Sequence, residues 1–179
     1  MKVEPIRDRE LIVRIKRYLI DTNKRNHLMF LTGIHCGFRI SDILKLQVKH
    51  VKGWDIRLFE EKTGKYRQVR MTKELKRAMR EYIQDKPKEE YLFKSRNGIN
   101  QPISRKRTYE ILRELADDFG LEQIGTHTLR KTYGYQHYKK FNNVATIMTA
   151  LNHTSQRETM IYLGIEQEEL DKQQSKIDW

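Results

Sequence analysis

A histidine and an arginine three residues apart are the first pair in this sequence that could do chemistry. His127 and Arg130 lie in the segment GTHTLRKTYGY, and residues three apart on a helix are surface neighbours. A guanidinium can donate to two oxygens of one phosphate while an imidazole donates to a third. The pair therefore fits a phosphate group, although histidine and arginine at this spacing are more often ordinary surface residues.

Three further segments carry side chains of related chemistry. CGFRISDIL contains Arg39 between two expected helices, EKTGKYRQV contains Lys62 at an expected hairpin tip, and LNHTSQRETMIYLGI contains His153 and Tyr162. The sequence lacks the GxGxxG, GxxxxGK[ST], HExxH and GxSxG patterns, which mark dinucleotide, nucleotide, zinc-protease and serine-hydrolase sites. No pair of histidines has a compact metal-ligand spacing. We therefore expect neither a cofactor nor a metal.

The four segments, in this order, resemble the catalytic domain of the tyrosine recombinase (phage integrase) family. The motifs are GFRISDIL, KTGKYRQV, HTLRKT and NHTSQRETMIYL, and the resemblance runs from about Arg7 to Leu163. It implies an enzyme that breaks and rejoins DNA strands. In such enzymes a tyrosine attacks a phosphodiester, forms a 3′-phosphotyrosine link and is displaced by a free 5′-hydroxyl. The resemblance implies these catalytic residues: Arg39, Lys62, His127, Arg130, His153 and Tyr162.

The matched residue types suit phosphoryl transfer without a metal. The phenol of Tyr162 is a poor nucleophile until it loses its proton. Arg39 and Arg130 can meet the negative charge that spreads over the non-bridging oxygens. An ammonium at a hairpin tip can protonate the departing 5′-oxygen, and a histidine can hold the phosphate or accept the phenolic proton. Lys65 is a rival to Lys62 for the ammonium role.

The same residues also have simpler structural interpretations. Tyr162 could be a half-buried aromatic residue, Lys62 a solvated turn residue, and His153 a cap on helix carbonyls. Three positions depart from the family pattern. Asparagine replaces a usual glycine, methionine a common proline and aspartate a usual glutamate, at Asn152, Met71 and Asp42. Of these, Asn152 could shift the placement of the neighbouring His153.

The elements that must position these residues are mostly helices. Apolar residues at helical spacing, with capping residues at the ends, predict helices over 8–20, 28–36, 72–83, 104–119, 128–140, 144–151 and 156–163. Alternating apolar residues over 54–58 and 69–71 predict a β-hairpin with a lysine-rich, glycine-containing tip. We expect an α+β fold that is mainly α with a small antiparallel sheet, as in the catalytic domains that the sequence resembles.

Composition indicates one basic domain. The 179 residues include 36 Lys and Arg against 24 Asp and Glu, a net charge of +12, which favours a polyanionic partner such as nucleic acid. Residues 1–60 are net +6 and 61–110 net +8, whereas 166–179 are net −3. No apolar run is long enough to span a membrane, and no signal-peptide pattern opens the chain. The single cysteine, Cys36, excludes an internal disulfide, so we expect a cytoplasmic protein.

The expected organisation is a single catalytic domain over residues 1–179. We expect no N-terminal core-binding domain of the kind that family members usually carry, in which case the chain is either a fragment or a stand-alone short member. The resemblance implies double-stranded DNA as the partner, self-association as a tetramer on paired sites, and no membrane. The process would be integration or excision of a mobile element, or resolution of a replicon.

Alternatives from other classes stay open at this point. The same fold could serve a non-catalytic DNA-binding protein, or an enzyme that nicks and reseals one duplex as a topoisomerase does. A basic RNA- or ribosome-binding protein would explain the charge but not the ordered motifs. For the acidic tail, 166–179, we expect packing against basic surface on its own domain or on an adjacent copy. A frayed terminus is the alternative. The apolar residues that favour packing are Ile165, Leu170, Ile177 and Trp179.

Overall fold

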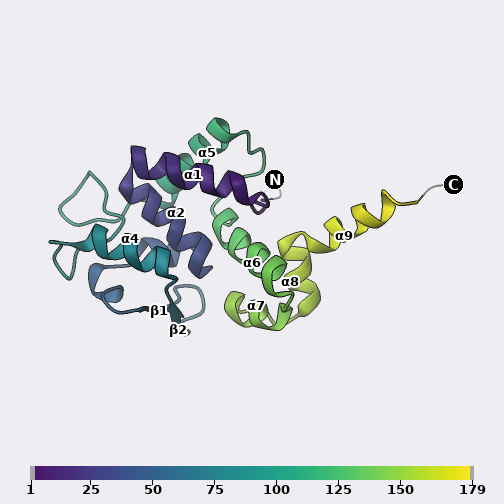
Figure 1. Ribbon diagram of the computed structural model, residues 1–179. Coiled ribbons are helices and arrows are strands. Elements are labelled where there is room, and N and C mark those ends of the chain that lie inside the picture. The colour runs from purple at the N-terminus through teal and green to yellow at the C-terminus, as the bar shows by residue number, and fades with distance from the viewer. Residues whose placement is uncertain (1–2, 178–179) are drawn as a thin grey trace.

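The computed structural model describes residues 3–177, which form helices and one two-stranded sheet. In chain order the elements are α1 (Arg9–Thr22), α2 (Lys24–Cys36), α3 (Ile40–Leu44), the 3-10 helix η1 (Val48–His50), β1 (Asp55–Phe59), β2 (Tyr66–Arg70), α4 (Lys73–Ile83), α5 (Arg105–Phe119), α6 (Thr128–Phe141), α7 (Val144–Leu151), α8 (Gln156–Leu163) and α9 (Ile165–Gln174). Figure 1 shows α1, α2, α4, α5 and the hairpin in one part of the molecule, with α6 leading to α7, α8 and α9. Within residues 3–177, no helix combines the length and apolar character that a membrane span requires.

Capping side chains set most of the helix boundaries, and the seven predicted helices are confirmed. Thr72, Ser104 and Ser155 each accept a hydrogen bond from the backbone N–H three residues later. α2 begins at Lys24, four residues earlier than expected, because Asn23 caps it. The sequence did not predict α3, η1 or α9. α3 and η1 are too short for a periodic pattern, and α9 is largely polar.

The predicted hairpin is also confirmed. β1 and β2 pair antiparallel, from Asp55 opposite Arg70 to Phe59 opposite Tyr66. Ile56 is buried between the sheet and the body of the domain, as strand alternation requires. Beyond β2, the N–H of Met71 donates to the carbonyl of Trp54 at 2.9 Å. A proline at that position has no N–H, so methionine extends the pairing by one hydrogen bond.

Three apolar clusters form the core, and the smallest one holds the C-terminal helices together. Two larger clusters share α2, which is buried along most of its length. The third joins α6, α7, α8 and the start of α9 through five buried residues: Tyr135, Ile147, Leu151, Leu163 and Ile165. The segment that carries Tyr162 is therefore anchored directly after the tyrosine, by Leu163 and Ile165.

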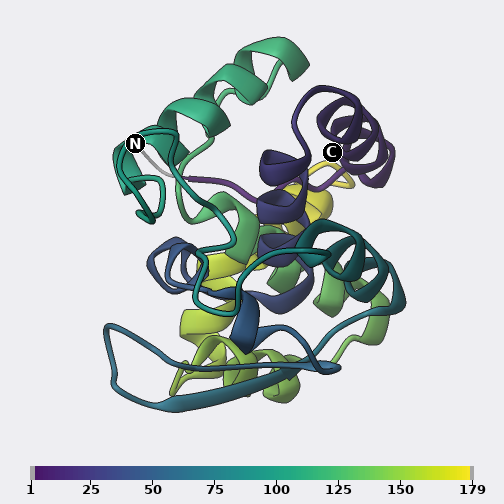
Figure 2. The ribbon, with the colours of Figure 1, turned by 90° about the vertical axis from the view of Figure 1, so that its left-hand side faces the viewer.

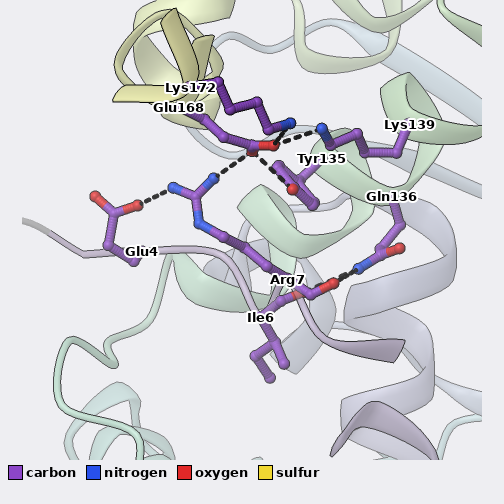
Figure 3. Close-up of polar contacts among 8 residues, drawn as sticks. All are labelled: Glu4, Ile6, Arg7, Tyr135, Gln136, Lys139, Glu168 and Lys172. Atoms are coloured by element: carbon purple, nitrogen blue, oxygen red, sulfur yellow. Dashed lines mark hydrogen bonds and ion pairs between the residues drawn. The ribbon is translucent and has the colours of Figure 1, made fainter. Parts of the chain in front are cut away.

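An ion cluster centred on Glu168 ties the acidic tail to the rest of the domain (Figure 3). The carboxylate accepts hydrogen bonds from Arg7 at 3.0 Å, Tyr135 at 2.8 Å and Lys139 at 2.6 Å. Lys172 donates to the same group from one turn later in α9, at 2.8 Å. Although burial raises the pKa of Glu168, hydrogen bonds from Lys139, Lys172 and Tyr135 lower it to about 2.

The tail therefore meets basic side chains of its own domain, but only over its first turns. α9 then extends away from the other helices (Figure 1), and Leu170 and Ile177 are 56% and 48% exposed. Trp179 lies outside the described residues. Docking of this tail on an adjacent copy stays a prediction.

The N-terminal segment is fastened to the same region. The N–H of Ile6 donates to Thr132 Oγ1 at 2.9 Å, and Gln136 Nε2 donates to the carbonyl of Arg7 at 2.8 Å. Both partners lie on α6, and Figure 3 shows Gln136 next to the Glu168 cluster. Residues 4–7, α6 and α9 are thus joined into one hydrogen-bonded unit.

Candidate active site

Arg130 lies at the centre of the candidate site, on the first turn of α6. It is 3% exposed. Its Nη1 donates to the carbonyl of Gly37 and its Nη2 to the carbonyl of Leu151, both at 2.6 Å. The guanidinium therefore joins the ends of α2 and α7 and cannot rotate freely. Burial lowers its pKa, yet an arginine remains charged.

The turn that supplies one of these carbonyls depends on glycine. Gly37 ends α2 in the left-handed conformation, with φ 64°. A Cβ at this position would lie 2.3 Å from the ring of Tyr133. Both the backbone angle and the close contact require glycine. The turn delivers Arg39 to the N-cap position of α3, beside the end of the hairpin.

A buried carboxylate that the sequence did not indicate holds Arg39. Glu60, at the end of β1, is 1% exposed, and its Oε2 lies 2.9 Å from Nη1 of Arg39. Arg67 and Thr63 also contact it, at 3.2 and 2.8 Å. Although burial raises the pKa of Glu60, hydrogen bonds from Thr63 and Arg39 lower it below the ordinary value. Glu60 is therefore an ionised anchor for two arginines.

A cavity of about 350 Å³ brings several expected residues together. Its walls include Arg39, Lys62 and His127, and also Arg105 at the start of α5. Arg105 was not singled out from the sequence, where it is one of many basic residues. A larger hollow of about 600 Å³ lies between Arg7 and α9, but it contains none of the expected residues. The smaller cavity is the candidate anion site because cationic side chains converge on it.

His127 and Arg130 lie at the start of α6. His127 is the N-cap residue, has helical backbone angles and is exposed, whereas Arg130, three residues later, is buried. They are still electrostatic neighbours. Partial burial, then the charges of Arg130 and Arg39, lower the pKa of His127. Its imidazole is therefore neutral near neutral pH and can either donate or accept a hydrogen bond.

His153 is placed by an unusual backbone angle at Asn152. Asn152 ends α7 in the left-handed conformation, with φ 53°, which asparagine tolerates better than other non-glycine residues. Asn152 thus adopts a conformation that glycine reaches without strain. The ring of His153 lies 3.1 Å from Thr159 Oγ1, through Nδ1. Burial lowers its pKa, and the charge of Arg130 contributes to the shift.

The phenol of Tyr162 lies against His153 but is not presented to the cavity. The two rings meet edge to face, with centroids 5.0 Å apart. The hydroxyl oxygen is buried and lies beside the guanidinium of Arg130. Burial raises the pKa of Tyr162, and the positive charge of Arg130 opposes the shift. The hydroxyl must therefore move, or the surrounding side chains must, before it can meet a ligand in the cavity.

The hairpin tip brings both candidate lysines to the site. Lys62 lines the cavity beside Arg39. Lys65 Nζ donates to the side chain of Asn152 at 3.0 Å, and Figure 2 shows the hairpin passing beside the α7 region. Geometry alone does not separate the two lysines, and the assignment of Lys62 stays a prediction. Across residues 3–177, no cluster of three or more His, Cys, Asp or Glu side chains could hold a metal ion.

Comparisons with known proteins identify the family. The Phage integrase family matches residues 8–169. The "Probable integrase/recombinase YoeC" of Bacillus subtilis is 47% identical over 167 residues, which cover 93% of this chain and 92% of that protein. A "Tyrosine recombinase" of Pseudothermotoga lettingae is 27% identical, over 94% of this chain and 64% of that protein. The chain therefore belongs to the phage integrase family.

Solved structures show the same fold. The XerA recombinase superposes with a TM-score of 0.77 at 19% identity, over 100% of this chain and 66% of that one. The catalytic domain of bacteriophage HP1 integrase gives a TM-score of 0.63 at 18% identity, over 89% of this chain and 86% of that one. The fold is thus that of a tyrosine recombinase catalytic domain, as predicted. The chain spans about two thirds of the XerA recombinase chain.

Proposed function

We propose that this chain acts as a tyrosine recombinase catalytic domain, which cleaves and rejoins double-stranded DNA through a 3′-phosphotyrosine link at Tyr162. The observation that carries the proposal is the setting of Arg130. A buried guanidinium, fixed by two carbonyls, lies electrostatically next to two imidazoles and the phenol of Tyr162. This is a set of groups suited to a phosphodiester and its transferring charge.

The chemistry assigns one task to each group. Arg39 and Arg130 hold the non-bridging oxygens of the scissile phosphate, and His127 donates to the same phosphate. The oxygen of Tyr162 forms a bond to phosphorus as the bond to the 5′-oxygen breaks. The phenolic proton passes to a base within reach, for which His153 is suited because its pKa is lowered. Lys62 gives a proton to the departing 5′-oxygen.

Rejoining reverses these steps. A 5′-hydroxyl attacks the phosphotyrosine, gives its proton to the lysine amine, and the phenol leaves as it regains a proton. The phosphodiester energy is conserved in the covalent link, so no nucleotide is consumed. Because the hydroxyl of Tyr162 is buried, the proposal includes a rearrangement that exposes it to the phosphate.

The proposed partner is duplex DNA. Residues 1–110 carry most of the positive charge, and a basic surface of this kind neutralises phosphates and releases counterions. Structural neighbours include a XerH recombinase "bound to palindromic difH substrate" and a Tn1549 transposon integrase "in complex with circular intermediate DNA". Assembly as a tetramer on paired sites, a cytoplasmic location, and a role in integration, excision or replicon resolution are further parts of the proposal.

Covalent trapping tests the proposal. Wild-type protein is incubated with nicked duplexes, from which the short cleaved strand diffuses away, and adducts are counted after denaturation. We expect an adduct with wild type and none with Tyr162→Phe, which removes only the nucleophilic oxygen. Tyr109→Phe, at an exposed tyrosine on α5, is the matched control and should form the adduct. An adduct with Tyr162→Phe, or none with wild type on its own target, would contradict the proposal.

A further inference from the structure

Lys131 follows Arg130 on α6 and lies over the face of the Tyr162 ring. Its Nζ is 4.8 Å from the ring centroid, within the range of a cation–π contact. The same ring meets the ring of His153 in a perpendicular, edge-to-face arrangement. The phenol ring is therefore contacted by both an ammonium and an imidazole.

The burial of this lysine calls for a physical reason. Lys131 is only 8% exposed, and removing an ammonium from water costs free energy. The surroundings make the cost larger, because Arg130 is adjacent in sequence and Arg39 is part of the same site. The contact with the ring of Tyr162 is one interaction that the charge of Lys131 makes in this position.

We propose that Lys131 is a positioning residue that holds the ring of Tyr162 and favours its ionised form; the inference rests on the proposed function of Tyr162. Its attraction to a neutral ring comes from the ring quadrupole. As the phenol loses its proton, negative charge spreads into the ring and the attraction increases. Lys131 therefore stabilises the transition state of strand cleavage more than the resting enzyme, which is the condition for accelerating a reaction.

Other charged and titratable groups also face Tyr162. Arg130 on α6 and Arg39 at the start of α3 act on its oxygen, and the ring of His153 packs perpendicular to its ring. Tyr133 and Tyr138, also on α6, belong to the same cluster. Burial raises the pKa of the Tyr162 phenol, so each nearby positive charge counteracts that burial. Lys131 differs from the two arginines because it acts through the ring face and leaves the phosphate to them.

The pH profile of cleavage tests the inference. Single-turnover cleavage of nicked DNA is measured with saturating protein, from neutral to alkaline pH, for wild type, Lys131→Gln and Lys131→Arg. We expect Lys131→Gln to cleave about 10-fold more slowly near neutral pH, the equivalent of one cation–π contact in a desolvated site. Its rate should continue to rise to higher pH than the wild-type rate does. Lys131→Arg keeps a cation and should keep the wild-type profile.

A matched control and a modified substrate separate this role from others. Lys140→Gln removes an exposed lysine that lies over Phe141, 5.3 Å from the ring centroid, on the same helix, and should cleave like wild type. Sulfur in place of the bridging 5′-oxygen gives a leaving group that needs no protonation, and should not rescue Lys131→Gln. Rescue by that substrate would make Lys131 a proton donor and would overturn the inference.

The outcomes distinguish this inference from the proposed function. If wild type forms no adduct, the proposed function itself fails. If wild type cleaves and Lys131→Gln matches it in rate and pH profile, only the role of Lys131 is wrong. Circular dichroism and DNA affinity of each variant show whether a lost rate reflects lost folding or binding. A changed pH profile in Lys131→Arg would also overturn the inference.

Discussion

Single residues divide into those whose chemistry is visible in the sequence and those whose role depends on burial. Arg130 and Tyr162 could be selected from their motifs, because the residue type and its neighbours carry the signal. Glu60 could not, since a glutamate at the end of a strand resembles any solvated turn residue. Its 1% exposure and its contact with Arg39 come from the packing of the hairpin on the domain.

The buried state of the Tyr162 hydroxyl is another property that the sequence could not supply. It depends on how α8 packs on α6, and that packing is set by residues such as Leu163 and Leu151 in the third core cluster. The motif identifies a tyrosine but does not say whether its oxygen is exposed.

At this scale we predict that Arg130→Lys loses cleavage although it keeps the charge. A lysine cannot donate in two directions to the carbonyls of Gly37 and Leu151 and still face a phosphate. We expect cleavage to fall at least about 100-fold, as for loss of a donor that meets transition-state charge. The free energy of unfolding should fall by about 1–3 kcal/mol, because a buried carbonyl loses its hydrogen-bond partner. Trapping rates and urea denaturation measure the two effects.

Arg113→Lys is the control for that substitution. Arg113 lies on the surface of α5 and contacts Asp117 at 3.5 Å, so the change should leave cleavage and stability nearly unaltered. Wild-type cleavage by Arg130→Lys would show that the fork geometry of the guanidinium is not needed.

Secondary-structure elements were predictable where their ends carry capping residues. Ser104 and Gly120 define α5, and Ser155 defines the start of α8. α3 has five residues and no side-chain cap, so neither periodicity nor capping could reveal it. The approach of α2 to α6 at Gly37 was equally hidden, because it is a contact between segments almost a hundred residues apart in the chain.

At the element scale we predict that Gly37→Ala is more harmful than Gly120→Ala. Both glycines end helices in the left-handed conformation, with φ 64° and 67°, which costs an alanine about 1–2 kcal/mol. At Gly120 nothing lies within 4 Å of the added Cβ, whereas at Gly37 the ring of Tyr133 is 2.3 Å away. Because both variants carry the same backbone cost, the difference between their thermal unfolding measures the steric clash with Tyr133.

The same comparison extends to activity. Gly37 supplies a carbonyl to Arg130, so Gly37→Ala should also slow cleavage, whereas Gly120→Ala should not. Equal unfolding free energies for the two variants would mean that the α2–α6 contact adapts without strain.

The whole molecule links its N-terminal segment to the helix that follows the nucleophile. Family, fold class and the small sheet could all be predicted from the sequence, because ordered motifs and helix periodicity extend over most of the chain. The Glu168 cluster could not, since it joins Arg7 to a residue 161 positions away. An acidic tail on a basic protein indicates attraction, but it does not indicate which basic residues are contacted.

At this scale we predict that Glu168→Gln destabilises the protein at neutral pH but not in acid. The folded-state pKa of Glu168, about 2, lies below the ordinary 4.5, so its stabilisation is complete above 4.5. It is lost as the pH falls toward 2. Allowing for solvent screening, we expect the free energy of unfolding of Glu168→Gln to be about 1–2 kcal/mol lower than that of wild type at neutral pH. Denaturant unfolding of wild type and variant across this range measures it.

Glu166→Gln, at an exposed position on α9, is the control: it removes one negative charge from the same helix and should change the free energy of unfolding little. A difference between wild type and Glu168→Gln that stays constant from neutral pH to pH 2 would show that the ionised carboxylate is not what stabilises the tail.

The central claim is tested most directly by identifying the residue to which DNA becomes covalently attached. The covalent adduct from nicked DNA is digested with nuclease and trypsin, and its peptides are analysed by mass spectrometry. Trypsin cuts after Arg157 and Lys172, so residues 158–172 form one peptide in which Tyr162 is the single tyrosine. We predict that this peptide carries a nucleotide bound through its 3′-phosphate. A nucleotide on any other residue, or a link through a 5′-phosphate, would contradict the account.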